Sequence, residues 1–174
     1  MKSILIRLII IGEGAQKIRK KHLGKLLSSN YQSTVGTEFA MKEMNIGEYI
    51  IKFQTWELLT DLKFKTVRSV YYYGAGGIII VFNKEQKKSF NEITLYFNEF
   101  KKHNGKRIED FSPNQLVLLG LQDNGNDIRI SKEEGEALAQ TLGMKYYEMT
   151  VEESRKISTI LTKMGEAYIA QFTH

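Results

Sequence analysis

The sequence predicts an α/β fold, a doubly wound and mostly parallel sheet of six strands flanked by about five helices. Three observations support this prediction. Short apolar runs at 3–11, 78–82 and 115–120 are typical of strands buried on both faces. Segments with apolar residues at helical spacing alternate with these runs, and glycines or polar loops separate the two kinds of segment. This alternation indicates βαβ units within one domain that covers residues 1–174.

The amino-terminal part predicts a strand, a helix and a hairpin. A glycine turn separates the first strand from a helix in which apolar residues lie among many lysines. Two segments with alternating polarity flank Gly47 and predict a hairpin. These elements occupy residues 3–11, 16–27, 39–45 and 49–56.

The stretch 52–82 predicts a complete βαβ unit around which the rest of the chain is arranged. Its first strand ends at Trp56, and a polar segment follows. An amphipathic helix then places Phe64, Val67 and Tyr71 on one face. A glycine-rich segment ends this helix and leads into the buried strand 78–82.

The carboxyl-terminal half continues the alternation of helices and strands. Aromatic and apolar residues at helical spacing predict a first helix, and a polar loop follows it. Ser131 and Glu134 form a capping box that opens a second helix. The predicted elements are helix 86–103, strand 115–120, helix 131–142, strand 146–149 and helix 154–172.

Composition excludes several classes of function. The 174 residues are 42% hydrophobic and 26% charged, as in an ordinary soluble globular protein. The absence of cysteine excludes disulfides, thiolate metal sites, a cysteine nucleophile and lipid attachment through cysteine. We therefore expect a cytoplasmic protein without a stable membrane anchor, peripheral to membranes only through a partner. A net charge of +5 permits an acidic partner, but by itself predicts no nucleic-acid binding.

The turn after the first strand is where a phosphate-binding loop lies in α/β proteins. Gly12 and Gly14 occupy this turn, but the pattern G-x-x-x-x-G-K-[ST] is not completed. Counted from Gly12 without gaps, the lysine position is Ile18 and the Ser/Thr position is Arg19. If one residue is deleted from the loop, Lys17 falls on the lysine position.

Nearly the whole chain resembles Rab/Ras-like small GTPases. The pieces that carry the resemblance occur in the family's order: 33–36 (STVG), 52–54 (KFQ) with Trp56, 71–72 (YY) with 74–75 (GA), and 131–138 (SKEEGEAL). The resemblance implies a small G domain that binds GTP or GDP with Mg²⁺ and acts in trafficking or signalling. It also implies that any nucleotide site lies at the carboxyl ends of the strands.

By the same resemblance, the motifs of the nucleotide site are largely replaced, as in a pseudoGTPase. Where the family has Asp-Thr-Ala-Gly-Gln, residues 57–61 read ELLTD, so the water-positioning glutamine aligns with Asp61. The guanine-binding motif aligns with 121–124 (LQDN), which leaves Asn124 in place of the aspartate. The family's later Ser-Ala-Lys becomes 150–152 (TVE).

The expected loss of affinity is large. Four missing charge-assisted hydrogen bonds, at roughly 1.5–3 kcal/mol each, remove on the order of 6–12 kcal/mol if they are additive. Nanomolar binding corresponds to about −12 kcal/mol. We therefore expect no nucleotide cofactor and no catalytic residues for GTP hydrolysis.

A remnant of the site is still implied by the resemblance. Thr34 aligns with the family's magnesium-contacting threonine, and Glu57 replaces its aspartate, so these two residues would serve a metal if Mg²⁺ binds. The implied nucleotide-binding set is Gly12, Gly14, Lys17, Thr34, Glu57 and Asn124. The alternative is that the polar members of this set are now ordinary polar residues.

The first helix carries a basic cluster with two interpretations. In the functional interpretation, the cluster replaces the phosphate-binding residues or contacts anionic lipid or nucleic acid. In the other, it is an ordinary solvated helix face. No aromatic residue is interleaved with it, so we expect no nucleic-acid partner. The cluster comprises Lys17, Arg19, Lys20, Lys21, His22 and Lys25.

An aromatic trio completes the candidate residues. In the family that the chain resembles, aromatic residues at the positions of Phe39, Trp56 and Tyr71 form the exposed patch that protein effectors bind. Large aromatics on strands and helices are also common core residues, which is the alternative. Tryptophan and tyrosine are favoured as binding anchors, so a partner-binding surface is our preferred interpretation.

Three functional hypotheses remain. The first is a protein-interaction module with a degenerate nucleotide site. The second is an atypical GTP/GDP switch with weak or absent hydrolysis. The third is a binder of a different phosphorylated ligand in the same crevice.

Overall fold

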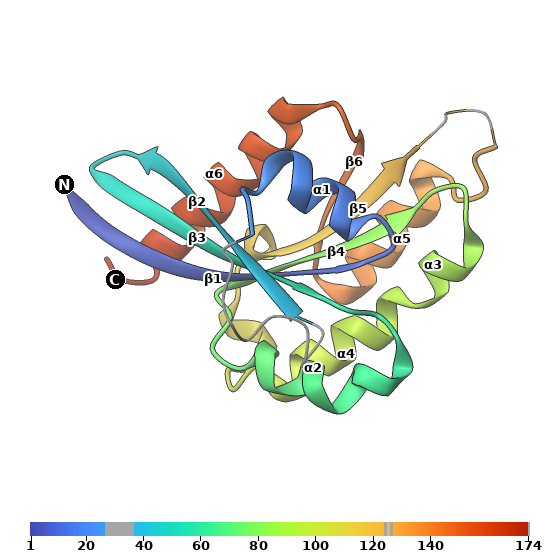
Figure 1. Ribbon diagram of the computed structural model, residues 1–174, viewed down its shortest axis with the longest axis horizontal. Coiled ribbons are helices and arrows are strands. Elements are labelled where there is room, and N and C mark those ends of the chain that lie inside the picture. The colour runs from blue at the N-terminus through green and yellow to red at the C-terminus, as the bar shows by residue number, and fades with distance from the viewer. Residues whose placement is uncertain (27–36, 124, 126, 174) are drawn as a thin grey trace.

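The computed structural model in Figure 1 describes residues 1–26, 37–123, 125 and 127–173. One six-stranded sheet has the strand order β2-β3-β1-β4-β5-β6. Only β2 is antiparallel to its neighbour, and all other neighbouring strands are parallel. The strands are β1 (Lys2–Gly12), β2 (Thr37–Ile46), β3 (Tyr49–Leu58), β4 (Gly77–Asn83), β5 (Leu116–Gln122) and β6 (Lys145–Thr150).

Helices cover both faces of this sheet (Figure 1). On one face, α1 and α6 contribute Ile18, Ile160 and Leu161 to a core over β1, β3 and β4. On the other face, Tyr72 of α2 and Phe100 of α4 lie in a second core. The helices are α1 (Ala15–His22), α2 (Lys65–Tyr72), α3 (Lys87–Asn91), α4 (Ile93–His103), α5 (Lys132–Leu142) and α6 (Ser154–Ala170).

The predicted fold class is confirmed. Every residue of β4 is buried, as expected of a central strand in a parallel sheet with helices on both faces. The predicted hairpin pairs Ile46 with Tyr49 around Gly47. None of the helices within the described ranges combines the length and apolar character needed to cross a bilayer.

Two predicted helices differ from the structure. The helix predicted at 16–27 ends at His22, because Gly24 adopts a left-handed φ of +99° and turns the chain. A Cβ at Gly24 would lie 2.4 Å from the carbonyl oxygen of Met41, so the turn requires glycine. Leu26 then forms a β-bridge with Ala40 in place of a helical turn.

The helix predicted at 86–103 is divided into α3 and α4, with Glu92 between them. The Ser89 hydroxyl donates to the backbone carbonyls of Asn83 and Gln86, and it accepts a hydrogen bond from the Asn83 amide. These bonds hold the short α3 against the end of β4. The apolar spacing in the sequence therefore predicted the helical face but not this local anchoring.

Candidate functional site

The candidate site lies at the carboxyl ends of β1 and β3, where the doubly wound topology places ligands. The turn between β1 and α1 and the loop after β3 line a pocket of about 260 Å³. Residues 12–17 form one wall and residues 57–60 the other. The glycine turn, Lys17 and Glu57 thus line the same pocket.

The glycine turn has backbone geometry that only glycine adopts without strain. Gly12 and Gly14 have φ values of +117° and +97°. A Cβ at Gly12 would lie 2.0 Å from the carbonyl oxygen of Val81 in β4, so the turn packs directly against the neighbouring strand. Gly14 caps α1, and its carbonyl accepts a hydrogen bond from the Ile18 amide.

Lys17, the candidate phosphate-contacting lysine, pairs with a residue after β5. Its Nζ lies 2.5 Å from Oδ2 of Asp123, and both side chains are partly exposed. Solvent screening limits such a pair to about 0–1 kcal/mol of stability. Asp123 follows the end of β5 and precedes Asn124, which lies outside the described residues, as does Thr34.

Glu57, the candidate magnesium ligand, is occupied by an arginine. Nε of Arg19 lies 2.9 Å from Oε1 of Glu57, and the two side chains are only 5% and 11% exposed. Removing either charge would leave the other nearly buried without its partner. No group of three or more His, Asp or Glu side chains in the described ranges is placed to hold a metal ion.

The sequence contained a signal for this pair that our prediction missed. Counted without gaps, Arg19 takes the position of the phosphate loop's metal-binding Ser/Thr, and Glu57 takes that of the metal-associated aspartate. Two positions associated with one metal ion are therefore occupied here by opposite charges. Opposite charges at adjoining positions are expected to pair with each other.

The prediction of a single basic face on α1 is wrong. Arg19 and His22 are buried, and His22 Nε2 lies 2.5 Å from the carbonyl oxygen of Val151. Lys17 and Lys21 are exposed, but each pairs with a carboxylate. Helical spacing placed these basic residues on α1, but the packing of the helix divides them between the interior and the surface.

The three predicted aromatic residues form one continuous row. The ring centroids of Phe39 and Trp56 lie 4.7 Å apart, and those of Trp56 and Tyr71 lie 5.2 Å apart. The Arg7 guanidinium lies 5.7 Å from the Trp56 ring centroid, within range of a cation–π contact. All three aromatic residues are partly buried, and Trp56 and Tyr71 pack against the core on this side of the sheet.

Comparison with known proteins identifies the family. A family model described as Ras family matches residues 7–170. The chain belongs to the Ras family.

Individual relatives of this Ras-family protein are distant but cover most of its length. The GTP-binding protein yptV2 of Volvox carteri is 26% identical over 171 residues, covering 96% of this chain and 76% of that protein. The Ras-related protein Rab-8B of Bos taurus is 28% identical over 157 residues, covering 88% and 73%. The GTP-binding protein ypt2 of Schizosaccharomyces pombe is 28% identical over 148 residues, covering 83% and 71%.

The loop after β3, which aligns with the second switch of the Ras family, is held by a buried arginine. Two nitrogens of Arg68 in α2 donate to both carboxylate oxygens of Glu99 in α4, at 3.0 and 2.8 Å. Nη1 of Arg68 donates to the carbonyls of Leu59 and Asp61 at 3.0 and 2.9 Å. Figure 1 shows α2 and α4 side by side under the same face of the sheet.

The hydroxyl of Tyr72 completes this buried cluster. It donates to Glu99 Oε2 at 2.8 Å, and burial together with the nearby carboxylate raises the pKa of Tyr72. Arg68 and Glu99 are 1% and 6% exposed, so the ion pair is almost fully removed from water. No sequence pattern indicates this cluster, because its members come from two helices that meet only in the folded protein.

A further charged cluster joins the carboxyl ends of β4 and β6. It is expected to make the stability of the protein depend on pH. Lys84 Nζ and the Tyr146 hydroxyl each bond Glu148 Oε2 at 2.7 Å. Burial disfavours the Glu148 carboxylate, but the bonds from Lys84 and Tyr146 outweigh burial and lower its pKa.

Because this pKa is lowered by folding, ionised Glu148 stabilises the protein above the pKa of the unfolded chain, about 4.3. This contribution is lost as the pH falls through the lower pKa of the folded state. We expect Glu148→Gln to lower the free energy of unfolding at pH 7, with the deficit shrinking below about pH 4. Urea titrations of both proteins at several pH values measure this difference. A deficit that grows as the pH falls would contradict the assignment.

Proposed function

We propose that this Ras-family chain is a protein-interaction module, acting in trafficking or signalling, that does not use guanine nucleotide as a switch. The observation that carries the proposal is the nearly buried pair between Arg19 and Glu57, of which Glu57 lines the pocket. The pair lies where, by alignment, the family's residues serve a magnesium ion. A protein with its own cation at this place does not require a metal ion to balance Glu57.

Other charges in the crevice also disfavour a magnesium-bound nucleotide. Lys17 already pairs with Asp123. Glu13 lines both this pocket and a neighbouring crevice, and that crevice is also lined by Asp61. Carboxylates beside the glycine turn, where a phosphate would lie, repel a polyphosphate. Separating the nearly buried Arg19 and Glu57 side chains would also cost several kcal/mol. We infer that the residues present do not fit the nucleotide in the way that the family's motifs hold it.

The aromatic row supplies the proposed interaction surface. Phe39, Trp56 and Tyr71 make tilted ring contacts in a row across β2, β3 and α2, and all three side chains are only partly buried. Partly exposed Trp and Tyr side chains, here on β3 and α2, are well suited to anchor a partner protein. The Arg7 guanidinium donates to the backbone carbonyls of Tyr71 and Tyr73 and holds the end of α2 beside this row.

The second candidate is an atypical GTP/GDP switch, and two observations favour it. The turn at Gly12 and Gly14 keeps backbone geometry suited to a phosphate loop. Two of the relatives carry the name GTP-binding protein. In this alternative, the Arg19–Glu57 pair would open when nucleotide and Mg²⁺ bind.

Nucleotide content and thermal stability distinguish the two candidates. We expect protein purified without added nucleotide to release less than about 0.1 equivalent of GDP or GTP on denaturation, and its Tm to stay unchanged with millimolar Mg-GTP. A ligand at one hundred times its Kd stabilises a protein by about 2.7 kcal/mol, so binding would be visible as a shift in Tm. Stoichiometric guanine nucleotide would contradict the proposal. Adenine nucleotides and inorganic phosphate in the same assay test the third hypothesis of another phosphorylated ligand.

The aromatic surface is tested by substitution. We expect Trp56→Ala to abolish the capture of specific partners. The Kd for a purified partner should rise at least about thirtyfold, because anchor residues contribute about 2 kcal/mol or more to binding. Phe172→Ala is the matched control, since Phe172 is an exposed aromatic outside the row. Circular dichroism confirms that both variants fold. Equal partner binding by a folded Trp56→Ala variant would contradict this assignment.

A further inference from the structure

Helix α1 is bonded to several segments that surround the candidate site. Lys17, in its first turn, pairs with Asp123 after β5. Lys21, one turn further along, pairs with Glu152 after β6, and its Nζ lies 2.8 Å from Oε2. The first of these loops aligns with the family's guanine-binding motif, and the second with its Ser-Ala-Lys motif. Side chains of α1 thus bind loops that serve a ligand in the family.

Buried contacts fix the same helix in place. Arg19 forms the nearly buried pair with Glu57 at the end of β3. His22 is 8% exposed, and its Nε2 donates to the carbonyl oxygen of Val151, since a carbonyl oxygen only accepts. The carbonyl oxygen of His22 itself accepts from Lys42 Nζ of β2 at 2.7 Å. Salt screens buried pairs much less than exposed ones, so these attachments persist when the ionic strength rises.

The pairs of Lys17 and Lys21 lie in a different environment. The side chains of Lys17 and Asp123 are 52% and 26% exposed, and those of Lys21 and Glu152 are 50% and 75% exposed. Exposed ion pairs are weak, and salt weakens them further. Lys17 and Lys21 are four residues apart and therefore lie on one side of the helix, yet each reaches a different loop. The helix thus combines firm inner attachments with outer ones that open easily.

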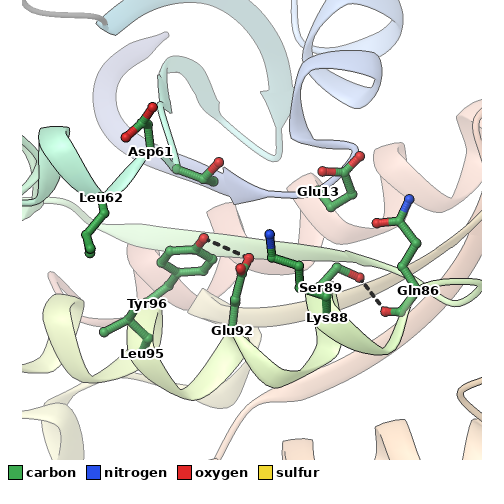
Figure 2. A pocket seen from close by; sticks show the side chains of 10 residues that line it. Glu13, Asp61, Leu62, Gln86, Lys88, Ser89, Glu92, Leu95 and Tyr96 are labelled. Atoms are coloured by element: carbon green, nitrogen blue, oxygen red, sulfur yellow. Dashed lines mark hydrogen bonds between the residues drawn. The ribbon is translucent and has the colours of Figure 1, made fainter.

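The carboxylate nearest to α1 along the chain takes no part in these contacts. Glu13 precedes the helix by two residues, and Figure 2 shows its side chain at the neighbouring crevice, together with Asp61 and Glu92. Lys17 instead pairs with a residue 106 positions away. The pairing of Lys17 therefore depends on where the fold places α1 and not on the closeness of charges in the sequence.

We propose that α1 is an electrostatic clasp whose exposed pairs, through Lys17 and Lys21, hold the loops after β5 and β6 closed and release them when salt or an anion weakens these pairs. The buried contacts keep the helix itself in place. Lys17 also lines the crevice. An anion that enters the crevice competes with Asp123 for the ammonium group, so its binding is coupled to release of the loop after β5. The clasp depends neither on the aromatic row nor on the identity of a ligand in the crevice.

Exchange of backbone amides with water, measured by NMR on the ¹⁵N-labelled full chain, tests the clasp. The Gly125 amide donates to Glu85 Oε1 at 3.0 Å, and the Ser154 amide donates to the Glu152 carbonyl at 2.9 Å. Each amide exchanges when its loop opens. Raising NaCl from about 0.1 M to about 1 M shortens the screening length from about 10 Å to about 3 Å. We expect exchange at Gly125 and Ser154 to rise about two- to fivefold, and exchange at Ile18 within α1 to stay unchanged.

Substitutions identify the lysines. At low salt, Lys17→Gln is expected to raise exchange at Gly125, and Lys21→Gln at Ser154, each about two- to fivefold. The control is Lys132→Gln, which removes the same charge from an exposed pair on α5. This control is expected to leave exchange at both amides unchanged.

A charge exchange separates the ion pair from other effects of Lys21. The double variant Lys21→Glu, Glu152→Lys forms an opposite pair again and should return exchange at Ser154 to the rate of the unaltered chain. The clasp is overturned by exchange that does not respond to salt, that rises equally in the Lys132→Gln control, or that stays raised in the double variant. The salt comparison on the unaltered chain decides the matter even if a variant does not fold.

Discussion

Replacing Glu99 by leucine is expected to lower the free energy of unfolding by about 3–5 kcal/mol. The Arg68 guanidinium, 1% exposed, would remain buried without its charge partner. Tyr72 would also lose the acceptor for its hydroxyl. Urea denaturation followed by circular dichroism measures the change from the midpoint and slope of the transition.

A double-mutant cycle separates the ion pair from other effects of the substitution. We expect the double variant Arg68→Met, Glu99→Leu to lose less unfolding free energy than the two single variants together, by at least about 1 kcal/mol. In the double variant no charged side chain remains buried without its partner. The exposed pair between Lys132 and Glu136 on α5 serves as the control. Breaking that pair should cost less than about 1 kcal/mol. A loss below this value for Glu99→Leu would contradict our account of the cluster.

This cluster has a consequence for function. In small GTPases of the switch type, contacts to the γ-phosphate order the switch loops, which are released on hydrolysis. Here the carbonyls of Leu59 and Asp61 are bound by Arg68, a residue of the protein itself. In this structure the loop after β3 is therefore attached to α2 through a residue of the protein itself.

Sequence patterns predicted the fold because hydrophobic periodicity and helix capping are local properties of the sequence. The run at 78–82 is apolar at every position, and only a strand covered on both faces tolerates this composition. Ser131 and Glu134 predicted the start of α5 correctly, since a capping box involves residues three apart in sequence. The end of α1 was not predicted. Glycine is required at position 24 because the carbonyl oxygen of Met41 in β2 lies too close for a Cβ atom, and this contact forms only in the folded protein.

The candidate site was predicted only in part, for the same physical reason. The resemblance indicated the glycine turn and the aromatic residues, and it gave Glu57 to a metal ion only if Mg²⁺ binds, without indicating its bond to Arg19. Its bond to Arg19 joins residues 38 positions apart, so the signal for it lies not in a local pattern but in the alignment of both positions with residues that serve one metal ion. The half-buried state of the aromatic row likewise depends on how α2 packs beside β3, so sequence alone left the core and surface interpretations open.

Replacing Arg19 by serine, the residue type that the family's phosphate loop allows here, is expected to destabilise the protein by about 3–5 kcal/mol. Glu57, with its side chain 11% exposed, would keep its charge without a partner. Lys20→Ser is the control, because Lys20 is the exposed neighbour on the same helix and its loss should cost less than about 0.5 kcal/mol. Urea denaturation with and without Mg-GTP measures both effects.

The response of the Arg19→Ser variant to Mg²⁺ tests whether the guanidinium stands in for a metal ion. If Glu57 lies where Mg²⁺ is able to bind once the arginine is removed, Mg²⁺ should restore part of the lost stability to the variant while leaving the unaltered protein unchanged. A gain by both proteins would mean that Arg19 yields to the metal, as a working switch requires. A loss of stability below about 1 kcal/mol would show that the pair contributes little, and the crevice would then be open to nucleotide on energetic grounds.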